Sequence, residues 1–370
     1  MKKDYLTKSF LFFLVLSIIL FYISISLFAF DLDFGGQFNA SLTGFYDHEY
    51  GYGYLPQANL DLELFIPPWD DNEVRIAGYL YTDMAQKKID FFWKKLYWKH
   101  RFDNFHLTIG RQPISWSFGS LLNPLDYSLG AVALDEDYNS KYHDAIDIYY
   151  PINWNTSLSL VASISGNFDN LKIGLRGRTL INDFDVTVHY IQENEMQGKP
   201  ERQQFGITAK GDIGKYGVYG ASGFYIYPNK GSSFSLLAGI DYSYYFQAGN
   251  RLYLQGEYLN IPREILPLIT GSMMSDENED DDKNIHLLVG NISYSIDDFS
   301  SISIAAFDNI SDGTVLFMPN YSNQINTNTS FKLQTGITLK TTGKHILNLS
   351  EKTFLVPTQF FVEAGIEYTF

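Results

Sequence analysis

Hydrophobic and polar residues alternate along most of the chain. Residues 360–370 show the pattern most clearly. One parity carries the apolar and aromatic residues Phe360, Val362, Ala364, Ile366, Tyr368 and Phe370. The other parity is mainly polar and includes Glu363 and Glu367. Because successive side chains of a strand point to opposite faces, this pattern predicts a strand with one apolar face and one polar face.

The same alternation recurs in segments of about ten residues, which is the length of a tilted membrane-spanning strand. Residues 156–166 and 233–246 are clear examples, and turn-forming residues separate the segments. We count about eighteen segments, with sixteen as the alternative count. The pattern predicts an all-β fold, a single transmembrane antiparallel β-barrel that occupies residues 30–370.

The connections between these segments sort by length. Those after even-numbered segments are short, as at 182–183 and 214–215. The two longest, near 113–141 and 261–283, both follow odd-numbered segments. Outer-membrane barrels have short periplasmic turns and long external loops. The sorting therefore predicts a closed barrel with an even number of strands and long external loops at these two places.

Residues 1–29 are typical of a secretory signal peptide. Lys2, Lys3 and Lys8 precede an apolar run over residues 10–28. This run is longer than the roughly 7–15 residues usual in a signal peptide, so an uncleaved anchor helix stays open as an alternative.

Composition narrows the function classes. Aromatic residues make up 16% of the chain, as expected where Tyr, Phe and Trp form girdles at both membrane interfaces. The chain has no cysteine, which excludes disulfides and thiolate metal sites. The net charge of −15 disfavours a nucleic-acid partner. Seven scattered histidines show no zinc-binding spacing, and we predict neither a metal nor another cofactor.

Two stretches resemble known outer-membrane barrels. The aromatic end of the chain, Tyr368 and Phe370, resembles the closing strand that the barrel-assembly machinery reads. The stretch Gly110–Gly119, followed by Asn-Pro-Leu-Asp at 123–126, is similar to a segment of alginate-export-like and related bacterial porins. In those families it leads from a strand into a long loop, although Ser117 here replaces their usual Gly. The resemblance implies a channel.

Charged residues on the polar parity are the candidates for lining a pore, because a charge on a lipid face costs about 2–4 kcal/mol for Arg or Lys at mid-depth. The predicted pore-lining residues are Arg75, Lys95, Lys172, Arg176, Lys210, Asp241, Arg251 and Glu257. Lys94 falls on the wrong parity, which requires either a bulge in its strand or a side chain that reaches back to the interface.

The loop near 113–141 is too apolar to be wholly solvated. We predict that it folds into the barrel and sets the narrowest section. Contact with a neighbouring protomer is the other way in which its apolar side chains could be buried. The predicted constriction residues are Arg111, Trp116, Asp126, Asp135, Glu136 and Asp137. The plainer alternative is that Arg111 and Asp126 only tie the loop to the barrel wall.

The sequence therefore predicts a passive porin-type channel for small hydrophilic solutes in a Gram-negative-type outer membrane. The expected partners are membrane lipid, lipopolysaccharide, the barrel-assembly machinery and the solutes, and a homo-oligomer stays open. The acidic run at 276–282 suits an external loop that contacts lipopolysaccharide through divalent ions. The alternatives are a purely structural barrel and a barrel protease or phospholipase, for which Asp47, His48 and Asp83 are the candidates. Ten or twelve strands would favour such an enzyme.

Overall fold

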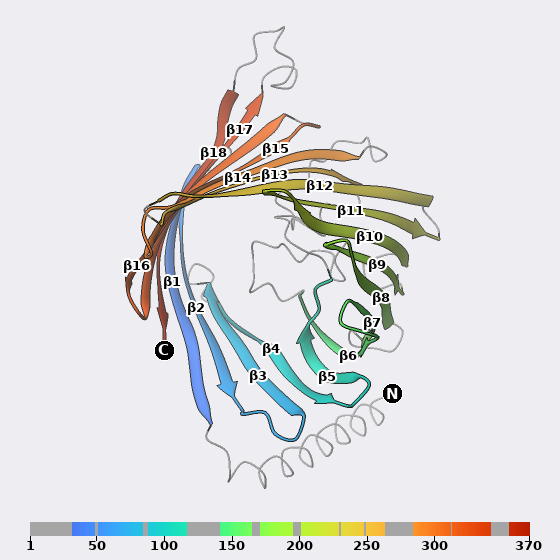
Figure 1. Ribbon diagram of the computed structural model, residues 1–370. Helices are drawn as coiled ribbons and strands as arrows, with labels where there is room; N and C mark the ends of the chain where they lie inside the picture. The colour runs from blue at the N-terminus through green and yellow to red at the C-terminus, as the bar shows by residue number, and fades with distance from the viewer. Residues whose placement is uncertain are drawn as a thin grey trace, which may run out of the picture.

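Eighteen antiparallel strands form one sheet (Figure 1). The computed structural model describes residues 32–48, 51–83, 88–116, 141–164, 171–194, 201–228, 231–247, 249–262, 284–311, 313–341 and 355–370. The strands are β1 (Asp33–Asp47), β2 (Gly51–Phe65), β3 (Asn72–Asp83), β4 (Lys88–Arg101), β5 (His106–Pro113), β6 (Tyr142–Pro151), β7 (Thr156–Ile164), β8 (Leu171–Ile181), β9 (Phe184–Glu193), β10 (Arg202–Ile213), β11 (Tyr216–Tyr227), β12 (Gly231–Tyr245), β13 (Arg251–Ile261), β14 (Ile285–Ser295), β15 (Ser300–Asn309), β16 (Thr314–Asn326), β17 (Thr329–Thr341) and β18 (Leu355–Thr369). The larger of the two predicted strand counts is confirmed.

The sheet closes on itself, because β1 pairs with β18 as well as with β2. The last residue takes part in the closure: Phe370 and Gly36 exchange backbone hydrogen bonds of 3.0 and 3.1 Å. The rings of Tyr368 and Phe370 stack with centroids 6.2 Å apart on the outward face, where each is more than two-fifths exposed. Among the described strands, closure leaves no unpaired edge, which is a requirement for a sheet surrounded by lipid.

Short connections lie at one end of the barrel, here named the short-turn end. The turn residues Asp70, Asp71, Asn182 and Asp183 have positive φ, as two-residue hairpin turns require. In the turn that follows β14, Asp297 accepts hydrogen bonds from the backbone N–H groups of Phe299 and Ser300. The Phe299 bond holds the pKa of this exposed carboxyl below its usual value.

The opposite end, here named the long-loop end, carries the widest gaps between strands. These gaps follow β5, β13 and β17, all odd-numbered strands, so the predicted sorting of connections holds. The acidic run at 276–282 and the predicted signal peptide lie outside the described residues.

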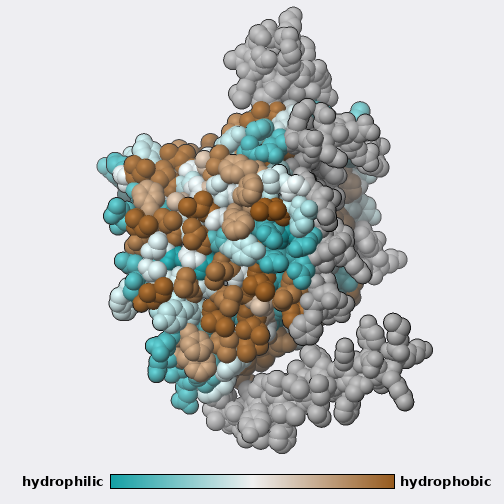
Figure 2. All heavy atoms as spheres, turned by 90° about the vertical axis from the view of Figure 1, so that its right-hand side faces the viewer, coloured by the Kyte–Doolittle hydropathy of each residue, from teal (hydrophilic) through white to brown (hydrophobic). Residues whose placement is uncertain are grey.

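The outward face is apolar, as the alternation predicts. Large side chains such as Phe38, Leu42, Ile240 and Ile366 are 42–54% exposed there. Figure 2 shows such hydrophobic side chains spread over one side of the outer surface. Among the described residues, no helix is long and apolar enough to cross a membrane.

Lys94 reaches the inward face through a β-bulge. The β3–β4 register steps from Ala77↔Lys95 directly to Gly78↔Trp93, which leaves Lys94 as the extra residue. Its ammonium group pairs with Asp61 on β2, and its side chain is only 10% exposed. Of the two explanations for its parity, the structure therefore supports the bulge.

Candidate functional site: the inner wall of the barrel

The eight predicted pore-lining residues all occupy inward-facing positions. The strand register shows this for three of them. Lys172 is the register partner of Glu193, Lys210 that of Asp185, and Glu257 that of Gly239, all on the face opposite the exposed apolar side chains. At the short-turn end, Arg251 donates to Ser243 Oγ (3.0 Å from Nη2). Whether the eight line a conducting path stays a prediction.

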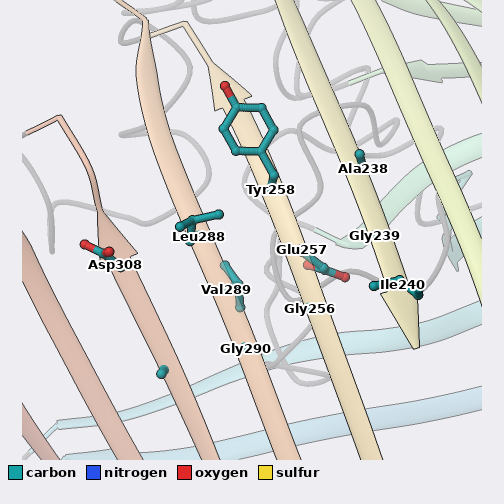
Figure 3. Close-up of a pocket in the computed structure, with 11 residues that line it drawn as sticks. Ala238, Gly239, Ile240, Gly256, Glu257, Tyr258, Leu288, Val289, Gly290 and Asp308 are labelled. Atoms are coloured by element: carbon teal, nitrogen blue, oxygen red, sulfur yellow. The ribbon is translucent and has the colours of Figure 1, made fainter. Parts of the chain in front are cut away.

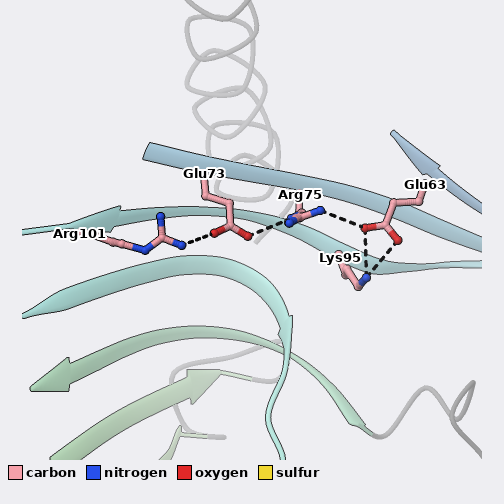
Figure 4. A network of polar contacts seen from close by, with 5 residues as sticks. All are labelled: Glu63, Glu73, Arg75, Lys95 and Arg101. Atoms are coloured by element: carbon pink, nitrogen blue, oxygen red, sulfur yellow. Dashed lines mark hydrogen bonds and ion pairs between the residues drawn. The ribbon is translucent and has the colours of Figure 1, made fainter. Parts of the chain in front are cut away.

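A chain of ion pairs crosses the inward face of β2, β3 and β4 (Figure 4). Arg75 stands between two carboxylates, 2.9 Å from Glu73 and 3.9 Å from Glu63. Glu63 also pairs with Lys95 at 3.1 Å, and Glu73 with Arg101 at 2.8 Å. The three basic side chains are 30–40% exposed, so water reaches this network.

A second set of ion pairs on β8–β10 is more deeply buried. Glu193 lies 2.7 Å from Arg202 and 3.8 Å from Lys172. The three side chains are only 13%, 5% and 9% exposed. Nearer the short-turn end, the pair of Arg178 and Asp185 at 2.5 Å is open to water, with side chains 55% and 30% exposed. Of the three buried residues, only Lys172 is among the eight predicted, although the parity of the strands places Glu193 and Arg202 on the same face.

The inward face of β11–β15 is apolar toward the long-loop end. Its buried cluster consists of Tyr219, Ala221, Tyr225, Tyr227, Leu237, Leu259, Ile261, Ile285, Leu287, Val289 and Phe307. One carboxylate, Glu257, lies beside it at 4% exposure and accepts hydrogen bonds from Tyr219 Oη (2.5 Å) and Gln255 Nε2 (3.0 Å). These two donors satisfy part of the hydrogen-bonding capacity of a carboxylate buried in an apolar setting.

These observations divide the interior into two parts. The buried wall is the inward face of β7–β15 in the half nearer the long-loop end, where Val161, Ile191 and Leu259 are 0% exposed. The open wall is the inward face of β17, β18, β1 and β2, continued by the ion pairs of β3 and β4. No inward-facing position from Gln37 to Asp47 on β1 or from Gln359 to Thr369 on β18 is buried.

The residues that follow β5 turn into the barrel. Ile114 and Trp116, each 5% exposed, pack with Ala145, Val161 and Ile191, which face inward. The Trp116 ring lies 6.1 Å from that of His189 on β9, between centroids. Between these residues and the inner wall is a hollow of about 200 Å³, lined in part by Arg176 and Arg178. The chain thus enters the interior at the start of the predicted constriction loop.

Arg111 does not lie where the constriction prediction put it. It pairs with the outward-facing Leu96, while its neighbours Gly110 and Gln112 face inward. Its guanidinium donates to the Trp93 carbonyl (2.5 Å) and pairs with Asp144 at 3.3 Å. The alternation of strand faces directs Arg111 outward, so it ties the end of β5 to its neighbours. Asp126, Asp135, Glu136 and Asp137 lie outside the described residues.

A larger hollow, of about 590 Å³, opens on the outer face of β12–β15 (Figure 3). Small residues on the outward parity, among them Ala238, Gly256, Gly290 and Ala306, form much of its floor, with Tyr258 and Asp308 toward the long-loop end. It faces away from the interior, so it is no part of a path through the barrel. Among the described residues, no three His, Asp or Glu side chains gather as a metal site.

The fold matches solved structures at low sequence identity. OpdQ of Pseudomonas aeruginosa matches with a TM-score of 0.56 and 8% identity, over 92% of this chain and 99% of that chain. OccAB3 of Acinetobacter baumannii matches with a TM-score of 0.55 and 10% identity, over 92% and 99% of the two chains. The outer membrane protein opdK of Pseudomonas aeruginosa gives 0.55 and 8%, over 91% and 98%.

These matches show a shared barrel fold of the porin type. They do not support the narrower resemblance to alginate-export-like porins. No family model and no curated protein matches the sequence.

Proposed function

We propose that this chain is a passive channel for small hydrophilic solutes across the outer membrane. The observation that carries the proposal is the open wall within a closed barrel of eighteen strands. Barrels of about 16–18 strands leave an aqueous lumen, whereas eight strands are filled by their own side chains. The count also weighs against the barrel-enzyme alternative, for which ten or twelve strands were expected.

The chemistry of the open wall suits hydrated solutes. Asn39, Ser41, Thr43 and Gln57 contribute amides and hydroxyls, and the β2–β4 ion pairs add charges of both signs. The donors and acceptors of such a wall can replace part of a solute's hydration shell. The proposed path therefore runs off-centre, along the open wall.

The segment that follows β5 is proposed to narrow this path. Support comes from Ile114 and Trp116, which fix its start against inward-facing residues. The proposal extends to residues 117–140, which lie outside the described residues, and to a finer kinship with alginate-export-like porins. Lipopolysaccharide contact, delivery by the barrel-assembly machinery, cleavage of residues 1–29 and a homo-oligomer belong to the same proposal.

The direct test is electrical. Purified, refolded protein in planar bilayers should give stepwise single-channel currents in KCl, and liposomes that contain it should swell in small sugars and amino acids. Heat-modifiable, fully inserted protein that yields neither currents nor swelling would favour the structural-barrel alternative.

The contribution of the inward segment can be measured in the same bilayers. Trp116→Ala removes a 5%-exposed anchor and should raise conductance severalfold, because the start of the segment loses its hold on the wall. Trp154→Ala, at a fully exposed position in a turn at the short-turn end, is the matched control and should leave conductance unchanged. Equal conductance in both variants would remove the segment from the path.

A further inference from the structure

Two phenylalanines interrupt the polar chemistry of the open wall. Phe45 on β1 and Phe361 on β18 face inward as direct register partners across the closing seam. The two strands otherwise carry mainly polar inward residues, among them Thr43 and Glu363. Phe45 is 41% exposed, so part of its ring is accessible from the barrel interior.

Both rings lie flat against the wall, and two glycines make this possible. The row across four strands reads Gly336, Phe361, Phe45, Gly53. A Cβ atom on Gly53 would come within 2.3 Å of the Phe45 ring, and one on Gly336 within 2.0 Å of the Phe361 ring. Each ring therefore covers the glycine beside it. The result is an aromatic platform, defined here as Phe45 and Phe361.

Carboxylates stand in the rows on either side of the platform. Toward the long-loop end, Asp47 pairs with Gln359, whose amide donates a hydrogen bond of 2.8 Å. On the other side is Glu363, which makes no hydrogen bond or ion pair with any other described residue. Further along β17, Lys332 is held by Glu367 at 2.6 Å. The platform is thus bordered by negative charge.

We propose that the platform is a binding subsite for an organic cation of the alkylammonium type on its way through the channel. An aromatic face attracts a cation through its quadrupole, and exposed examples contribute about 0.5–1 kcal/mol each. Neighbouring carboxylates add attraction for the same charge and repel anions. The inference rests on the proposed channel function, to which it adds a solute class.

Channel block is the test, with choline as the probe and glucose and benzoate as the neutral and anionic comparisons. Choline should interrupt the KCl current at concentrations where the other two do not. Replacing Phe45 or Phe361 with Leu should weaken block about two- to fivefold each, and Phe45→Trp should strengthen it, because Trp is the best cation–π partner. Glu363→Gln should also weaken block.

Two further variants separate ring orientation from ring identity. Gly53→Ala keeps Phe45 but lifts its ring from the wall, so it should weaken block to a similar degree. Phe360→Leu is the matched control, because Phe360 is the neighbour of Phe361 on β18 but lies on the outward face, and this variant should leave block unchanged.

The outcomes are distinct for the two proposals. Stepwise KCl currents without choline block, or block by glucose instead, would overturn the cation subsite and leave the channel function standing. Saturation-transfer NMR between aromatic protons and choline methyl groups tests the subsite in folded protein whether or not it conducts. Loss of that transfer in the Phe45→Leu, Phe361→Leu double variant would support the subsite, and unchanged transfer would refute it.

Discussion

The two walls of the barrel interior are built on the same strand geometry but differ in chemistry and in contact with water. On the open wall, the ion pairs of Arg75, Lys95 and Arg101 keep 30–40% exposure of the basic side chains. On the buried wall, the cations that share Glu193 are below 10% exposed, and the neighbouring cluster is apolar. Charges on the two walls therefore differ in solvation: protein covers those around Glu193, whereas water reaches Arg75, Lys95 and Arg101.

The largest expected effect comes from breaking the buried ion pairs. Glu193→Gln removes a carboxylate that Lys172 and Arg202 share, and breaking a buried pair costs about 3–5 kcal/mol of folding free energy. The matched change on the open wall, Glu63→Gln, should cost at most about 1 kcal/mol, because its pairs are solvated. Both losses of folding free energy can be measured by urea unfolding of refolded protein, with the heat-modifiable gel mobility as the probe of the folded fraction. Equal losses would show that the two walls do not differ in solvation.

A smaller contrast concerns apolar side chains of one type. Leu259→Ala at a fully buried inward position should cost about 2–5 kcal/mol, because it leaves a cavity. Leu55→Ala, also inward-facing but on the open wall, should cost less than about 1.5 kcal/mol, since its side chain is already partly in water. The same unfolding assay applies. A Leu55 variant as unstable as the Leu259 variant would mean that the open wall is covered as well.

Alternation along the sequence is sufficient to predict the strands and the inward set, and the sorting of connection lengths predicts the closure. The period of two fixes which face each side chain takes, and all eight predicted pore-lining residues occupy inward positions. The same rule places Arg111 outward. The prediction that Arg111 belongs to the constriction followed its place in the loop motif instead, and it is wrong for that reason. Lys94 is a case where the alternation rule itself fails. An extra residue in β4 interrupts the period of two, and the position of this bulge is visible only in the pairing of β3 with β4.

The division into two walls was harder to predict, although part of its signal is present. A strand covered on both faces reads as a continuous apolar run. Leu287–Val289 and Leu236–Ala238 have this form, whereas 37–43 alternates strictly. Burial of the ion pairs on β8–β10 has no such signal, because charged residues read the same whether water or protein covers them. The Phe45–Phe361 contact depends on register between the first and last strands, which the pattern of either strand alone does not fix.

The smallest expected effect is electrical and sharpens the comparison most directly. Glu63 is the ion-pair partner of Lys95 and one of two carboxylates beside Arg75. Glu63→Gln therefore leaves positive charge less neutralised on the open wall, and the chloride-to-potassium permeability ratio should rise about twofold, as read from the reversal potential in a KCl gradient. Lys95→Met should shift the ratio the other way, because Glu63 is then less neutralised. Glu193→Gln serves as the control, since a charge change on the buried wall should leave the reversal potential of correctly folded channels where it was. If Glu193→Gln shifts the potential and the Glu63 and Lys95 variants do not, solutes pass along β8–β10, and the roles assigned to the two walls are reversed.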